Sequence, residues 1–392
     1  MSKPLRDIVI YADLPTAPLN RVWNGTALPA WCDGFYVRCG TNTSNESFGH
    51  VERLFLYSLG LRGTLPDTLS ALKYMDSFVI TFNELTGSLP STLGAWKNLT
   101  YLDLAFNKFT GTIPSYIADF TKLQCLCLSA NKFVGTILGN FASVSTLNNI
   151  DVMKNSLTGT IPPSFGSFTE LEYFLLSGNN LTGTIPSTMS NMPFMRGLEL
   201  ENNKMVGTIP IFLSTYTRLK RLILGGNKFT GTIPSGIGDL SMLYVVDLRN
   251  NKLEGTIPGN FASVSTLINI DMMENSLTGT IPPSFISFTK FEYFHFSGNN
   301  LTGTFPSDVS NMPLKNEVEL ANNEVVGTLP KILSSYARVQ QLILSSNKFT
   351  GTIPSAIGDL SMLYDIDERI KLNGTIPEMF DDWRLPGRVV FP

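Results

Sequence analysis

Side chains able to do acid–base, nucleophilic or metal chemistry are few in this chain and are not grouped along it. Its 392 residues include two histidines and four cysteines. His50 and His295 are far apart in the sequence, and two histidines are too few for most acid–base or metal sites. The sequence shows no glycine-rich phosphate loop, no nucleophile elbow and no cluster of metal ligands. We therefore expect no catalytic site, no bound metal and no cofactor, so the protein is predicted not to be an enzyme.

The charge and hydropathy of the chain exclude two classes of partner. The net charge is −3, so there is no excess of lysine and arginine to attract nucleic acid or anionic lipid. No apolar run is long enough for a membrane-spanning helix, and neither a secretory signal nor a lipid-anchor signal is recognisable. The hydrophobic fraction of 43% predicts a folded chain. We expect no nucleic-acid partner and no membrane span in this chain.

From Val51 onward the sequence repeats with a period of 24 residues. One unit, residues 99–114, reads LTYLDLAFNKFTGTIP. Its Leu102 and Leu104 alternate with period two, which predicts a short strand buried on one face. Because one unit cannot bury its apolar face alone, successive strands are expected to stack in parallel. Fourteen units start at Val51, Met75, Leu99, Leu123, Leu147, Leu171, Met195, Leu219, Leu243, Leu267, Phe291, Lys315, Val339 and Leu363.

Three further columns of residues define the rest of each unit. A side-chain amide both donates and accepts, so a column of asparagines such as Asn107 and Asn131 can satisfy backbone groups where the chain turns inward. Glycine follows, where the turn needs backbone freedom. Proline then ends the hydrogen-bonded pairing and starts an outer arc, which apolar residues such as Phe165 and Phe168 seal.

The motif LxxLxLxxNxLxGxIPxx resembles that of plant-type leucine-rich-repeat proteins. Receptor-like kinase and receptor-like protein ectodomains, polygalacturonase-inhibiting proteins and leucine-rich-repeat surface antigens of parasitic protozoa share it. The resemblance implies an α/β solenoid: a right-handed horseshoe or superhelix with a parallel β-sheet on the concave face and short 3-10 or irregular segments on the convex face. It also implies extracellular recognition through the concave face. A weaker similarity to the family's N-terminal cap involves Trp23, Trp31, Cys32, Gly34, Val37, Cys39, Val51, Leu54 and Leu56.

We expect three regions along the chain. Residues 1–50 form the cap, residues 51–378 form the fourteen repeats, and residues 379–392 form a C-terminal tail. Within the repeats, residues 139–258 are duplicated as 259–378, and several differences fall on outward-pointing positions, for example Leu175 against His295. Neutral drift and diversification of a lengthened surface both explain these differences.

Residues at the third, fifth, seventh and eighth positions of each unit are expected to point out of the concave sheet. In the first three units they form an aromatic surface, which predicts a protein or glycan ligand there. The alternative is that the cap covers these side chains. Tyr173 and Tyr293, equivalent in the two copies, could stack on a ring of the ligand. The predicted aromatic surface consists of Phe55, Tyr57, Val79, Phe82, Tyr101 and Phe106.

Two other columns on the surface have both a functional and a structural interpretation. The acidic fifth-position column suits a basic or sugar-rich partner, or is a solvated face that keeps the sheet soluble. The threonines after the glycines, such as Thr136 and Thr160, form a ladder that suits ice binding as a remote alternative, or else favour a short second strand. The acidic column consists of Asp103, Asp151, Glu199, Asp247, Asp271, Glu319 and Asp367.

Cysteines and glycosylation sequons bear on the compartment. Cys32 and Cys39 in the cap are expected to form a disulfide, which favours an oxidising compartment. Cys125 and Cys127 lie at i and i+2 of one strand, where a relaxed bridge is difficult, so we expect free thiols facing the concave surface. The glycosylation candidates are Asn24, Asn42, Asn45, Asn98, Asn180, Asn300 and Asn373.

The favoured function is non-enzymatic recognition of a protein or glycan through the concave face, as a receptor-like ectodomain or surface antigen. A soluble inhibitor of a secreted enzyme and a cytosolic interaction scaffold are the alternatives. We expect a secreted or cell-surface location, with the cytoplasm as the alternative.

Overall fold

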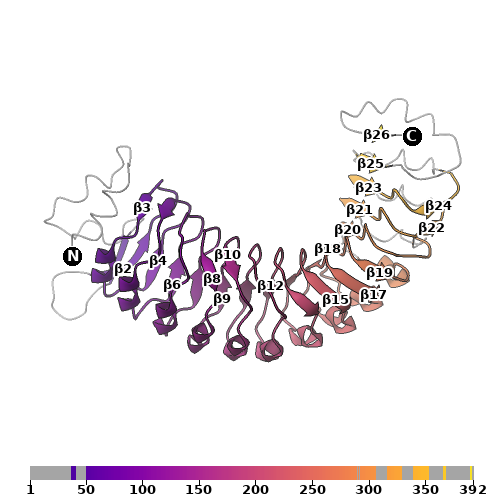
Figure 1. Ribbon diagram of the computed structural model, residues 1–392. Helices are drawn as coiled ribbons and strands as arrows, with labels where there is room; N and C mark the ends of the chain where they lie inside the picture. The colour runs from indigo at the N-terminus through magenta and orange to yellow at the C-terminus, as the bar shows by residue number, and fades with distance from the viewer. Residues whose placement is uncertain are drawn as a thin grey trace. The chain divides into compact units, whose positions relative to one another are not determined.

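The computed structural model describes residues 37–40, 50–288, 290, 292–305, 316–328, 339–352, 365–367 and 389–390. The chain divides into two compact units, Met1–Met195 and Arg196–Pro392. In both units each 24-residue repeat forms one coil, with a short strand on one side and, in the coils from residue 67 to residue 287, a 3-10 helix on the other (Figure 1). The predicted α/β solenoid, with a parallel sheet and short 3-10 segments on opposite sides, is confirmed.

The main strand of each repeat begins two residues after the predicted start of the unit, except in the first repeat, where the strand begins earlier. In the first unit of the chain these strands follow one another in sequence order, and β1 precedes them. They are β1 Val37–Gly40, β2 His50–Phe55, β4 Ser77–Val79, β6 Tyr101–Asp103, β7 Cys125–Cys127, β9 Asn149–Asp151 and β11 Tyr173–Leu175. In the second unit they are β12 Gly197–Glu199, β14 Arg221–Ile223, β16 Val245–Asp247, β18 Asn269–Asp271, β20 Tyr293–His295, β21 Glu317–Glu319, β23 Gln341–Ile343, β25 Asp365–Asp367 and β26 Val389–Val390.

The register of these strands stacks equivalent residues on one another. Phe78 pairs with Leu102, and Leu102 pairs with Leu126, all in parallel. These three side chains are buried, so each strand turns its middle residue into the core. The third and fifth residues of each repeat lie on the opposite face. We call this second face of the parallel sheet the open face.

Each unit carries one described strand that the repeat does not predict, β1 in the first unit and β26 in the second. β1 pairs antiparallel with β2 and so covers the edge of the first repeat strand. β26 pairs in parallel with β25, within the segment expected to be a tail. Both strands occupy an edge where backbone groups would otherwise be left unpaired.

The 3-10 helices start directly after the proline column. Their N-cap is a proline with extended backbone, except in η5, where Leu138 takes this place. As predicted, the residues three and six places after the proline are buried, and the rings of Phe165 and Phe168 lie 4.9 Å apart. The helices are η2 Asp67–Ala71, η3 Ser91–Ala95, η4 Ser115–Asp119, η5 Gly139–Ser143, η6 Pro163–Ser167, η7 Ser187–Asn191, η8 Ile211–Thr215, η9 Ser235–Asp239, η10 Gly259–Ser263 and η11 Pro283–Ser287.

The asparagine column has the predicted double role. Asn107 Nδ2 donates to the carbonyl oxygens of Ile80 in the preceding coil, at 2.7 Å, and of Leu104 in its own coil, at 3.2 Å. Its Oδ1 accepts the amide of Leu85, at 3.1 Å. Asn251 repeats the pattern in the second unit, with its Oδ1 accepting the amide of Phe229. Each buried amide thus ties its coil to the coil before it.

The glycine column and the threonine column fit together. Gly159 has a φ of +82°, so its backbone is in the left-handed region that favours glycine. A Cβ atom at Gly159 would lie 2.8 Å from Cγ2 of Thr136 in the preceding coil. The glycine therefore provides both the turn conformation and room for the threonine methyl group.

Short second strands lie next to this column, at the place where the structural interpretation of the threonines expects them. In the first unit β3 pairs with β5 and β8 with β10, and in the second unit β13, β15, β17 and β19 form one ladder and β22 pairs with β24. They are β3 Arg62–Thr64, β5 Glu84–Thr86, β8 Val134–Thr136, β10 Ser156–Thr158, β13 Val206–Thr208, β15 Lys228–Thr232, β17 Lys252–Thr256, β19 Ser276–Thr278, β22 Val326–Gly327 and β24 Lys348–Phe349.

Candidate functional site

Three exposed aromatic rings of the first unit form a continuous row, in which two rings are stacked and the third is tilted. The rings of Tyr57 and Phe82 have centroids 5.1 Å apart, and those of Phe82 and Phe106 have centroids 4.2 Å apart. These side chains are 58%, 45% and 44% exposed, respectively. Tyr101, also exposed, lies on β6 of the same sheet. We call Tyr57, Phe82, Tyr101 and Phe106 the aromatic cluster.

The backbone under two of these rings is unusual for a bulky residue. Phe82 and Phe106 have φ angles of +54° and +56°. Equivalent positions of other coils carry small or polar residues that tolerate this conformation better, such as Gly178 and Asn202. The fold therefore places phenylalanine where glycine or asparagine would be less strained.

The other members of the predicted aromatic surface contribute less exposed area. Phe55 and Val79 are half-buried and pair directly in the register of β2 and β4. The alternative that the N-terminal cap covers this surface depends on residues 1–36 and 41–49. These residues lie outside the described part of the chain. Tyr173 and Tyr293, on β11 and β20, are both half-buried.

Cys125 and Cys127 are free, as expected, but they are buried. Their Sγ atoms lie 2.7 Å apart, longer than the disulfide length of about 2.05 Å. Asn149 Nδ2 lies 3.6 Å from one sulfur and 3.7 Å from the other. The contact with Cys125, together with burial, raises the pKa of the Cys127 thiol, which favours its neutral, unreactive form.

The acidic column has a structural role that the sequence analysis missed. Asp103 Oδ1 accepts the backbone amide of Ala105, two residues further on, at 3.0 Å. Asp151 and Asp271 make the same bond to Met153 and Met273, at 3.1 and 3.2 Å. These are Asx-type turns, in which a short carboxylate caps the end of its own strand. Acidic residues recur in the fifth-position column partly because this turn recurs at the end of the strand in successive coils.

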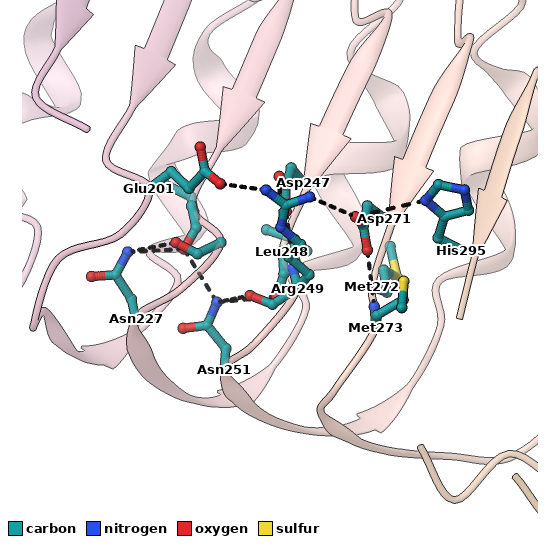
Figure 2. A network of polar contacts seen from close by, with 12 residues as sticks. Glu201, Asn227, Asp247, Leu248, Arg249, Asn251, Asp271, Met272, Met273 and His295 are labelled. Atoms are coloured by element: carbon teal, nitrogen blue, oxygen red, sulfur yellow. Dashed lines mark hydrogen bonds and ion pairs between the residues drawn. The ribbon is translucent and has the colours of Figure 1, made fainter. Parts of the chain in front are cut away.

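In the second unit the acidic column is paired with arginine rather than solvated. Asp247 and Asp271 are 7% and 4% exposed. Arg249 donates from Nη1 to Asp271, at 3.3 Å, lies 3.6 Å from Asp247, and donates from Nη2 to Glu201 (Figure 2). The structure thus differs from a fully solvated acidic face. Because Arg249 and Glu201 are seventh-position residues, a comparison along the fifth-position column alone does not reveal these ion pairs.

Burial and neighbouring charge shift the pKa of one buried carboxyl of this region. Burial raises the pKa of Asp247 to about 7, and the charge of Asp271 adds to this while Arg249 opposes it. Glu199, the preceding acidic residue of the column, is half-buried and accepts from Arg221 Nε at 2.6 Å.

His295 lies among carboxylates, a grouping that the sequence analysis also missed. Its Nε2 is 3.1 Å from Glu317 Oε2 and its Nδ1 is 3.8 Å from Asp271 Oδ2. Figure 2 shows the His295 ring facing Asp271. Reading the third and fifth positions of adjacent repeats together would have found this group, since His295 pairs with both Asp271 and Glu319 in the sheet.

The remaining predicted sites are only partly described. Asn98 and Asn300 are exposed and Asn180 is half-buried. The other glycosylation candidates, Asn24, Asn42, Asn45 and Asn373, and the Cys32 half of the expected disulfide lie outside the described residues. Within the described part of the chain, no helix has the length and hydropathy needed to cross a bilayer.

The repeats match a known family model. The model of the Leucine Rich Repeat matches residues 98–120, 170–192, 218–240, 242–264, 290–312 and 338–360. The chain thus contains leucine-rich repeats, and these repeats form the coils described above. No curated protein sequence matches it.

Solved structures with a similar fold include plant receptors. The plant peptide hormone receptor RGFR1 in complex with RGF2 is 31% identical, with a TM-score of 0.75, over 80% of this chain and 54% of that chain. The Arabidopsis receptor kinase HAESA, in complex with the peptide hormone IDA and the co-receptor SERK1, is 28% identical, with a TM-score of 0.79, over 93% of this chain and 64% of that chain. This chain thus spans about half of the first receptor chain and less than two thirds of the second.

A third similar structure belongs to a different functional class. A plant ice-binding protein is 25% identical, with a TM-score of 0.57, over 78% of this chain and 88% of that chain. The repeat fold is therefore shared by proteins with unlike ligands, and the function has to be argued from the surface.

Proposed function

We propose that this chain is a non-enzymatic recognition module that binds an extended segment of a protein ligand on the open face of its parallel sheet. The observation that carries this proposal is the row of exposed rings formed by Tyr57, Phe82 and Phe106, which contact one another in turn. Large exposed apolar clusters usually mark interaction sites, and aromatic anchors supply much of the binding energy of interfaces.

The arrangement of the rings suits a linear ligand. Phe82 and Phe106 occupy the same position of consecutive coils, so their spacing follows the strand spacing of about 4.8 Å. A peptide that crosses the strands meets one ring in each coil. The coil imposes a positive φ at this position, as at Ala130 and Asn202, and Phe82 and Phe106 are bulky aromatic residues at this strained position.

The comparisons support a peptide as the ligand class. The two receptor structures described above are complexes with peptide ligands, and their repeat regions align with most of this chain. By analogy, we infer a receptor-like recognition role and a secreted or cell-surface location for this chain.

Selection from a library of displayed linear peptides tests the proposal. We expect peptides that bind the full chain, and loss of their binding to the double variant Phe82→Ala, Tyr101→Ala. Tyr74→Ala, which removes an exposed aromatic outside the cluster, is the matched control and should bind as the unmodified chain does. Selected peptides that bind the double variant equally well would contradict the proposal. If the chain binds glycans but no peptide, the ligand is a sugar and the proposed peptide ligand is wrong.

A second candidate function is ice binding, and one observation favours it. The threonines on either side of the glycine column are exposed, as at Thr158 and Thr160, and adjacent coils repeat them at the strand spacing of about 4.8 Å. The structural similarity to a plant ice-binding protein is a second reason to test it. Thermal hysteresis of the purified chain should be measured, and its absence would remove this candidate.

A further inference from the structure

Three possible metal ligands meet on the open face of the second unit. His295, Glu317 and Glu319 each offer one ligand atom, and these atoms lie within 4.8 Å of one another. β20 and β21 pair in parallel with His295 opposite Glu319. Glu317 lies two residues before Glu319 and therefore points to the same face of β21. All three residues are half-buried, so they are held by the sheet yet reachable from solvent.

A fourth residue orients the histidine. His295 Nδ1 faces Asp271 Oδ2 at 3.8 Å, while Nε2 faces Glu317 Oε2 at 3.1 Å. When Nδ1 carries the ring proton toward a carboxylate, the lone pair of Nε2 is left for a metal, and this carboxylate–histidine arrangement is common behind metal sites. Asp271 is buried and held by the amide of Met273 and by Arg249, so its carboxylate is fixed in place.

We propose that His295, Glu317 and Glu319 form a binding site for a divalent transition-metal ion of the zinc class, with Asp271 as the positioning residue behind His295. One imidazole nitrogen and two carboxylates suit Zn²⁺, which often takes three protein ligands and leaves a position for water or a ligand group. Ca²⁺ prefers six to eight oxygen ligands and Mg²⁺ an octahedron of oxygens, so this set suits them less well.

The internal duplication supports the proposal. The first copy has Leu175 and Gly197 at the positions of His295 and Glu317, whereas Glu199 and Asp151 match Glu319 and Asp271. Two of the three ligands are therefore present in the second copy alone. The main strands and their register are the same in both copies, so neither side chain is required for the coil to form.

Protonation of His295 competes with the metal. Burial by itself would lower the pKa of His295, but the interaction with Asp271 and the charges of Glu319, Asp271 and Glu317 outweigh it and raise the pKa. Arg249 binds Asp271 on the side away from His295 (Figure 2). Metal binding must displace the proton from His295, so the apparent affinity should fall as the pH falls.

Calorimetric titration of the full chain with ZnCl₂ tests the site. We expect saturable binding that weakens between about pH 8 and about pH 6. His295→Leu, which restores the residue of the first copy, and the isosteric Glu317→Gln should each abolish this binding event. Asp271→Asn should weaken it by about 10- to 100-fold, since it acts through His295.

Two controls separate this site from other effects. Glu254→Gln removes an exposed carboxylate of β17 and should leave zinc binding unchanged. Substitution of Co²⁺ for Zn²⁺ should give visible absorption without the sulfur-to-metal band that the Cys125–Cys127 pair would add. The proposal is overturned if the unmodified chain does not bind zinc, if folded His295→Leu and Glu317→Gln bind it equally well, or if the cobalt complex shows thiolate ligands.

Discussion

The rings of Phe82 and Phe106 stack face to face, with centroids 4.2 Å apart and planes inclined by 8°. Both rings remain exposed, and both backbones adopt a positive φ that a bulky residue rarely takes. Neither the exposure of these rings nor their backbone conformation is explained by packing in the core. Four substitutions test the role of this surface and the interactions that stabilise the coils.

Phe82→Asn should separate ligand binding from stability. Asn202 and Asn250 occupy the equivalent position of other coils at a similar φ, so asparagine fits this backbone. The loss of ring stacking, about 0.5–1.5 kcal/mol, is offset by relief of backbone strain of similar size, and the net change in unfolding free energy should stay within about 1 kcal/mol. Affinity for selected peptides should fall by about tenfold or more. Unchanged affinity in a folded variant would count against the aromatic cluster.

Asn107→Ala should destabilise the first unit strongly. The substitution leaves the carbonyl oxygen of Ile80 and the amide of Leu85 without their side-chain partner in a buried place. Each unpaired group costs about 1–3 kcal/mol, so we expect a loss of about 3 kcal/mol in urea denaturation. Asn148→Ala, at an exposed position of the same unit, is the control and should change stability by less than about 0.5 kcal/mol. Equal effects of the two variants would refute the bridging role of the asparagine column.

Gly159→Ala should reveal the two roles of the glycine column. The new Cβ would require an alanine at φ +82° and would approach Cγ2 of Thr136 to 2.8 Å. We expect a loss of about 1–3 kcal/mol in thermal or urea unfolding. Adding Thr136→Ser, which removes this methyl group, should recover the steric part and leave the conformational part. If the stability loss of the double variant equals the sum of the losses of the two single variants, the contact with Thr136 does not contribute to the effect of Gly159→Ala.

Asp247→Asn should change how the stability of the second unit depends on pH. The pKa of Asp247 is raised to about 7 by burial and by Asp271, so the folded state holds this proton more tightly than the unfolded chain does. The contribution of Asp247 to the free energy of unfolding is therefore greatest below the unfolded pKa of about 3.9. It decreases by up to about 1.4 kcal/mol per pH unit as the pH rises from about 4 to about 7.

The asparagine variant lacks this titrating group. The two proteins should therefore differ most in the slope of the free energy of unfolding against pH. Relative to Asp247→Asn, the unmodified chain should lose stability as the pH rises from about 4 to about 7. Hydrogen exchange of second-unit amides such as that of Leu248, compared at equal pH, measures the difference. Parallel pH profiles of the two proteins would mean that Asp247 ionises normally in the folded state.

The sequence by itself determined the coil. A strict period of 24 residues requires that leucines, asparagines and glycines of successive coils meet, because only neighbouring coils can bury the apolar face of each repeat. The parallel register of Phe78, Leu102 and Leu126 follows directly from this constraint. The positions of Tyr57, Phe82 and Phe106 on the surface follow from the same periodicity.

Only the tertiary structure decided how neighbouring side chains on the open face pair with one another. The sequence places Asp247, Asp271 and Glu319 in one acidic column, but the structure joins the first two to Arg249 and brings His295 beside Asp271 and Glu317. Three of these four contacts join different columns, and His295 and Asp271 are direct neighbours in one column. Their distances depend on the strand spacing and on side-chain conformation, and a one-dimensional repeat does not specify which neighbours will interact. The repeat fixes which residues become neighbours, whereas burial and charge in the folded sheet fix which of them interact.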